Sequence, residues 1–138
     1  MAIKKDSIKI VVDKLNSYAA LQKNIEYLDK KIKIIDHELT KVKISRFEER
    51  RGGGNEYRIE KLLDKKSQLT NKLNDLKLEK KFIVEAVNSL DGIEREIIVD
   101  FYFKNLNISQ IAKKFLYSET HVRRLKSNAI TALEKFLN

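Results

Sequence analysis

Residues 107–125, NISQIAKKFLYSETHVRRL, carry two helix starts on either side of a short turn. Asn107 is followed three residues later by Gln110, the spacing of a capping box, in which each side chain bonds to the backbone of the other residue. Ser118 is a second N-cap, and nothing after it interrupts a helix. The sequence therefore predicts a short helix at 108–115, a turn at Leu116 and Tyr117, and a longer helix from Glu119.

A further helix is expected just before this pair. Asp91, followed three residues later by Glu94, marks its N-terminus, with the aspartate accepting from a free backbone amide, and the helix should run to about Lys104. Ala112 supplies the small residue where two helices cross. Apolar residues recur at helical spacing at Ile93, Ile97, Ile98, Phe101, Tyr102, Ile111, Phe115, Val122 and Leu125. Residues 91–138 are therefore predicted to form a small three-helix domain with a helix-turn-helix.

The outward face of the last predicted helix carries a polar, partly cationic stripe. Its members follow the spacing i, i+3, i+4 and i+7 and so share one side of the helix: Thr120, Arg123, Arg124 and Ser127. Glu119 and His121 lie beside it in the first turn. Such a helix can enter the major groove of DNA and point side chains at base edges. Lys113 and Lys114, on the preceding helix, are the expected phosphate contacts. The sequence from Phe101 onward contains 7 basic and 2 acidic residues.

Four segments together resemble region 4 of sigma-70 factors: LDGIEREII at 90–98, NISQIA at 107–112, SETHVRRL at 118–125 and AITAL at 129–133. The resemblance implies a DNA-binding module whose base-reading side chains are Glu119, Thr120, Arg123 and Arg124, with His121 and Asn128 nearer the DNA backbone. A helical N-terminal part joined to such a module looks like the phage-type late-gene transcription regulators of the ArpU and RinA kind. Leu116, Glu119 and Thr120 depart from the region 4 pattern, so the promoter element is not implied.

Residues 1–90 carry the apolar repeat of a coiled coil. Apolar side chains alternate at spacings of three and four over 18–42, and the repeat returns over 59–90. Lys66 and Lys80 occupy seam positions of the second run. A polar seam residue can fix register or partner number, and the alternative is a mild imperfection of the repeat.

Two features should interrupt this long helical region. The step from Tyr18 to Leu21 is three residues where four was due, a stammer that should overwind or bend the helix. The glycine-rich segment 51–55 should reverse the chain into an antiparallel hairpin, with Val42 near Asp64. Apolar residues off the seam suggest a homodimer through the coiled coil or a partner protein: Ile34, Ile44, Phe47, Leu63, Leu78 and Phe82.

Composition sets the class of protein. The 138 residues include no proline, no cysteine and two histidines, which predicts an all-α fold without disulfides, metal or cofactor. The sequence contains no catalytic constellation, so no enzyme is expected. The net charge of +9 suits a polyanion. With no signal peptide and no long apolar stretch, we expect no membrane partner and a cytoplasmic, nucleoid-associated protein of a bacterial host cell.

The leading functional prediction is a sequence-specific, double-stranded DNA-binding transcription regulator. Its hairpin, residues 1–90, would dimerise or contact RNA polymerase, and residues 91–138 would read DNA. The alternative is a coiled-coil interaction protein, an anti-activator or assembly factor, that uses the helix-turn-helix as a protein-docking face. A nonspecific DNA-packaging role fits less well with the order of the two parts.

Overall fold

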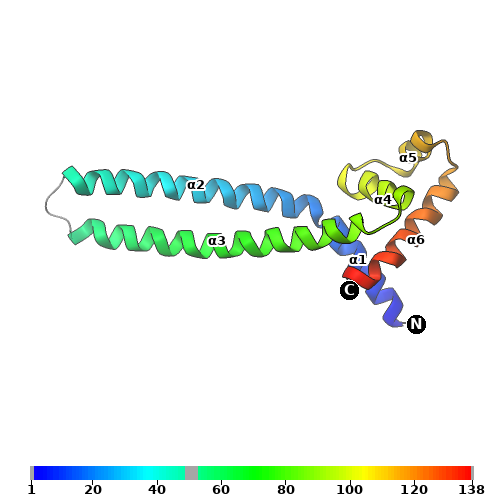
Figure 1. The fold of residues 1–138 in the computed structure, drawn as a ribbon, viewed down its shortest axis with the longest axis horizontal. Coiled ribbons are helices and arrows are strands. Elements are labelled where there is room, and N and C mark those ends of the chain that lie inside the picture. Colours follow the sequence, from blue (N-terminus) through cyan, green and yellow to red (C-terminus); the bar gives the residue numbers. More distant parts are fainter. Residues whose placement is uncertain (1, 49–52, 138) are drawn as a thin grey trace. The chain divides into compact units, whose positions relative to one another are not determined.

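The computed structural model describes residues 2–48 and 53–137, and the described residues form helices without any strand (Figure 1). The all-α prediction is confirmed. None of the described helices is both long and apolar enough to span a membrane. The helices are α1 (Ala2–Asn16), α2 (Tyr18–Glu48), α3 (Gly53–Asn88), α4 (Gly92–Ile98), the π-helix η1 (Val99–Phe103), α5 (Ile108–Phe115) and α6 (Glu119–Leu137).

The chain groups into two compact units. One contains residues 22–78, and the other joins residues 1–21 to residues 79–138. The division at residue 90 stays a prediction about domains. In the structure, helix α1, at the N-terminal end of the chain, packs against α6.

The unit at 22–78 is a hairpin of two antiparallel helices (Figure 1). The apolar seam predicted for α2 is largely buried, at Leu28, Ile35, Leu39 and Val42. The seam residue Lys66 forms an ion pair of 2.6 Å with Asp36 of α2. In the other unit, Nζ of the seam residue Lys80 lies 5.8 Å from the centre of the Tyr18 ring. Both seam lysines therefore have a partner on α2.

The ion pairs of the hairpin set its register. Arg58 lies 3.6 Å from Glu38, and Lys66 reaches Asp36. These pairs place the region of α3 opposite Val42 nearer the start of α3 than the predicted Asp64. Residues 51 and 52 of the predicted turn at 51–55 lie outside the described residues, and Gly53 begins α3.

The predicted disturbance near Tyr18 falls at Ser17, where α1 ends and α2 begins. The Ser17 hydroxyl donates to the carbonyl of Lys14 at 2.7 Å. A side chain that bonds to a carbonyl within the preceding turn competes with the helical ladder and often bends a helix. The off-seam apolar residues Ile34, Ile44, Leu63, Leu78 and Phe82 are exposed as predicted, and Phe47 lies outside the described side chains.

The other unit buries α1 and the end of α3 with the C-terminal helices. Its fully buried side chains include Val11 and Leu15 of α1, Ile83 and Val87 of α3, and Leu133 of α6. Nζ of Lys14 donates to the carbonyl of Leu137 at 2.6 Å, and the rings of Tyr18 and Phe103 stack with centroids 3.9 Å apart. Helix α1 is thus part of the unit that holds the helix-turn-helix.

The helix predicted from Asp91 to about Lys104 has the expected extent but changes its winding. It is α-helical to Ile98 and π-helical from Val99 to Phe103, with the amide of Lys104 donating to the carbonyl of Val99 at 2.9 Å. The wider turn places Asp100 in the interior, 1% exposed. The predicted cap at Asp91 is wrong in one respect, since its side chain makes no capping hydrogen bond.

Candidate nucleic-acid interface

Helix α5 begins with the predicted capping box. The amide of Gln110 donates to Oδ1 of Asn107 at 2.8 Å, and the amide of Asn107 donates to Oε1 of Gln110 at 2.9 Å. These bonds satisfy backbone donors that a helix start leaves free. The start of α5 is therefore determined by local sequence.

The turn between α5 and α6 contains a left-handed residue. Leu116 has φ 60° and ψ 39°, and its side chain is 91% exposed. Its position satisfies the end of α5, because the amide of Tyr117 donates to the carbonyl of Ala112 at 2.9 Å. Leucine pays a steric penalty in this conformation that glycine avoids. The departure from the region 4 pattern at Leu116 thus coincides with backbone strain.

Helix α6 starts at the predicted N-cap, where the amide of His121 donates to Oγ of Ser118 at 3.1 Å. One face of α6 then packs on α5. The buried core of this contact contains Ile97, Ile111, Ala112 and Val122, with Phe115 and Leu125 packed against it. The predicted contact between the two helices is confirmed, and α5 braces α6 from one side.

The opposite face of α6 is open to solvent. Eight of the nine residues predicted from the sequence to contact DNA are exposed, and His121 is half-buried. The exposed residues are Lys113, Lys114, Glu119, Thr120, Arg123, Arg124, Ser127 and Asn128. The polar stripe therefore faces outward on a helix that is fixed from behind.

Both arginines of the stripe are held by the first turn of α6. Nη2 of Arg123 lies 3.4 Å from a carboxylate oxygen of Glu119. Nη2 of Arg124 lies 2.9 Å from Nδ1 of His121. Because a guanidinium can only donate, Nδ1 of His121 is the acceptor in this contact. The ring of Tyr117 meets the ring of His121 edge-on, with centroids 4.8 Å apart.

The two lysines of α5 differ in their surroundings. Nζ of Lys114 lies 2.8 Å from Oδ2 of the buried Asp100, and Nζ of Lys104 lies 3.8 Å from Oδ1 of the same carboxylate. Lys113 has no ion pair within the described part of the chain. Sequence reasoning missed Asp100, although an acidic residue inside the apolar run Val99–Phe103 was a usable signal.

Lys126 of α6 packs over aromatic rings and does not extend with the exposed stripe. Its Nζ lies 3.7 Å from the centre of the Phe101 ring and 5.5 Å from that of Tyr102. Burial lowers the pKa of Lys126, and burial also raises the pKa of Tyr102. This lysine therefore serves as a cation over aromatic rings and is not part of the outward stripe.

Residues 86–135 match the family model of sigma-70, region 4. This segment is a sigma-70 region 4-like helix-turn-helix, as the sequence resemblance implied, and the match contains α4, η1, α5 and most of α6. Comparison with curated proteins and comparison with solved structures gave no match. The matched family is a DNA-binding regulatory domain.

Proposed function

We propose that the protein is a sequence-specific transcription regulator whose helix α6 enters the major groove of double-stranded DNA. The observation that carries the proposal is the exposed stripe Thr120, Arg123, Arg124 and Ser127 on a helix braced by α5. In a helix-turn-helix the second helix reads bases while the first crosses the DNA backbone. The region 4 match of residues 86–135 supports the same role.

Each polar residue has a place in this proposal. Arg123 and Arg124 reach guanine edges or phosphates, since a guanidinium can donate two parallel hydrogen bonds. Glu119 and His121 hold the two arginines at fixed angles before DNA arrives. Lys113 contacts phosphate directly. Lys114 shares its ammonium between phosphate and Asp100, because 46% of its side chain is exposed.

The hairpin supplies the second contact that a small DNA-binding unit needs. Its role in the proposal is to pair two copies of the chain or to contact RNA polymerase. This arrangement agrees with the resemblance to phage-type late-gene regulators. Light scattering gives the mass of the protein in solution, and co-purification with polymerase tests the second contact.

The decisive experiment is selection of a DNA site from a random duplex pool, run with and without RNA polymerase. Arg123→Ala and Arg124→Ala are then measured on the selected site. Each should weaken specific binding by about 1 to 3 kcal/mol while helicity is retained. Lys135→Ala removes the same charge from the exposed last turn of α6, outside the stripe, and is the matched control. Unchanged binding by both arginine variants would reject this recognition surface.

A second candidate function is a protein-docking role for the helix-turn-helix. The observation in its favour is the pair of exposed apolar side chains at the turn, Leu116 and Tyr117. Exposed apolar side chains that sit together often mark a protein contact. A pool selection that enriches no sequence, with or without polymerase, would favour this alternative.

A further inference from the structure

The two helices of the hairpin bury their seams unequally. On α2 the seam residues Leu28, Ile35, Leu39 and Val42 are buried. On α3, Leu73 alone is buried among the described seam residues between 56 and 78. The other apolar seam residues of this stretch are half-buried: Ile59, Leu62, Leu69 and Leu76. Apolar surface along α3 thus remains available to a further helix.

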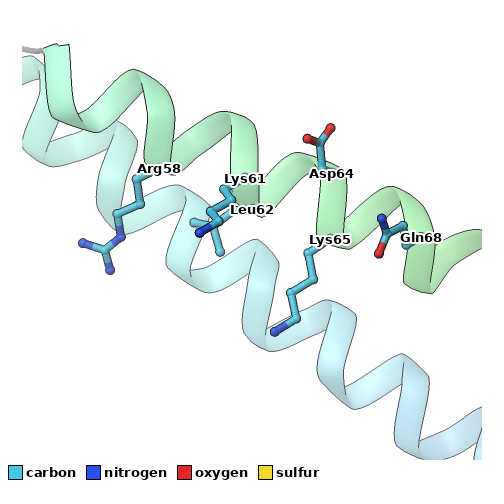
Figure 2. Close-up of a pocket in the computed structure, with 6 residues that line it drawn as sticks. All are labelled: Arg58, Lys61, Leu62, Asp64, Lys65 and Gln68. Carbon is cyan, nitrogen blue, oxygen red and sulfur yellow. The ribbon is translucent and has the colours of Figure 1, made fainter.

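A groove of about 520 Å³ opens along this side of α3. It is lined by Arg58, Lys61, Leu62, Asp64, Lys65 and Gln68. Figure 2 shows the side chains of Arg58, Lys61 and Lys65 extending toward α2, while Asp64 points away from it. The groove therefore combines a leucine with three cationic side chains and no inward-pointing acid among its lining residues.

The cationic side chains follow the coiled-coil repeat. Arg58, Lys65 and Lys72 are seven residues apart, and each directly precedes a seam residue of α3. In heptad notation these are g positions, which flank the seam and form salt bridges with a neighbouring helix. Leu62 and Leu69 each stand three residues before a lysine of this row, on the same side of α3. Leucines and lysines therefore form parallel rows.

Within the described residues, the hairpin pairs one cation of this row with an acid and leaves the two lysines without such a pair. Arg58 is paired with Glu38, and the residue one heptad before Glu38 on α2 is Lys31, a lysine instead of an acid. Nζ of Lys31 lies 4.9 Å from the Tyr27 ring rather than beside an acid. Within the described residues, neither Lys65 nor Lys72 forms an ion pair. Lys65 and Lys72 therefore add positive charge beside apolar surface.

We propose that this flank of the hairpin binds an acidic amphipathic helix of another protein. The helix would pack its apolar stripe on Leu62 and Leu69 and place carboxylates seven residues apart beside Lys65 and Lys72. A second copy of the hairpin would bring the same lysines to this flank, so pairing of two copies would have to use another face of the hairpin. Nucleic acid would neutralise the lysines but leave the leucines exposed. The proposal is independent of DNA binding by α6.

The test uses the full-length chain and a synthetic peptide of about four heptads with Leu at seam positions and Glu at the flanking positions. A second peptide has Lys in place of each Glu. Binding is followed by fluorescence anisotropy and by the gain in helical circular dichroism. The test variant is Lys65→Glu with Lys72→Glu. The matched control is Lys23→Glu with Lys30→Glu, which makes the same charge change with the same spacing on the outward face of α2.

The acidic peptide should bind and become helical, and the lysine peptide should not. The test variant should weaken binding at least about tenfold, because two attractions become repulsions, while the control should change it less than about threefold. Circular dichroism verifies that the test variant keeps the helical fold of the hairpin. The proposal would be overturned if the acidic peptide did not bind, or if the test and control variants lost equal affinity for it. It would also be overturned if duplex DNA displaced the peptide fully and Arg123→Ala did not change that displacement.

Discussion

Oδ2 of Asp100 lies 2.8 Å from Nζ of Lys114. The Asp100 side chain is 2% exposed, and this contact ties the π-helix η1 to the last turn of α5. Asp100→Asn keeps the shape of the side chain but removes the charge. We expect it to lower the free energy of unfolding by about 1.5 to 3 kcal/mol, the range for hydrogen bonds to charged groups. Lys104→Ala removes a longer contact to Asp100, made by a lysine that is largely exposed, and should cost less than about 1 kcal/mol. Urea denaturation measures both, and equal small effects would contradict the assigned role of Asp100.

Helix capping offers a matched comparison within one domain. Asn107→Ala removes a side chain that accepts from the amide of Gln110 and should destabilise by about 1 kcal/mol. Asp91→Ala, at the N-cap of α4, removes a side chain without a capping hydrogen bond and should be close to neutral. Thermal unfolding of the two variants tests the difference. A larger loss for Asp91→Ala than for Asn107→Ala would show that the caps are assigned wrongly.

Leu116 is expected to be a site where substitution stabilises the protein. Leu116→Gly relieves a left-handed conformation that costs a residue with a Cβ about 1 to 2 kcal/mol, and part of this gain is offset by greater freedom of the unfolded chain. The net gain should be roughly 0.5 to 1 kcal/mol. Leu116→Ala keeps the Cβ and is the control, which should show no such gain. Both are read from urea midpoints.

Tyr102 should titrate at higher pH than a free tyrosine side chain. Burial raises its pKa, so the folded protein holds this proton more tightly than the unfolded chain does. Above the ordinary tyrosine pKa of about 10, its contribution to stability is therefore lost as the pH rises. The absorbance of tyrosinate, followed across alkaline pH, should contain a late transition from Tyr102. Tyr102→Phe should remove that transition, and its persistence in the variant would contradict the assignment.

The two lysines of α5 should separate in DNA binding. Lys113→Ala should weaken binding to all duplexes alike and reduce the dependence of log K on log salt by about one unit, without loss of stability. Lys114→Ala should also destabilise the protein, because it removes the closer partner of buried Asp100. Titrations at several salt concentrations, combined with urea denaturation, distinguish the two effects. An unchanged salt slope for Lys113→Ala would exclude it from the phosphate contacts.

Local patterns in the sequence predicted local structure well. The starts of α5 and α6 are short-range hydrogen-bond arrangements at Asn107 and Ser118, so the few residues around them suffice. The outward direction of Arg123 and Arg124 also follows from helical spacing, once Val122 is placed in the core. The contacts of these arginines with DNA stay a prediction.

Features that depend on distant residues were not predicted. Asp100, in the π-helical turn, forms an ion pair with Lys114, which belongs to another helix. The packing of α1 on α6 joins residues as far apart as Lys14 and Leu137, and the apolar residues of α1 continue the coiled-coil repeat without marking a different partner. Periodicity identifies a buried face but not the element that covers it.

The packing of α1 on α6 also bears on the order of folding. Lys14 and Leu137 are separated by 123 positions in sequence, a long loop to close in an unfolded chain. A hairpin formed first from 22–78 brings the two segments that flank it together and shortens the path that must be closed. Local contacts form faster than distant ones. The hairpin can thus act as a template for folding of the other unit, residues 1–21 and 79–138. Substitutions that weaken the apolar seam of the hairpin should therefore slow the refolding of that unit.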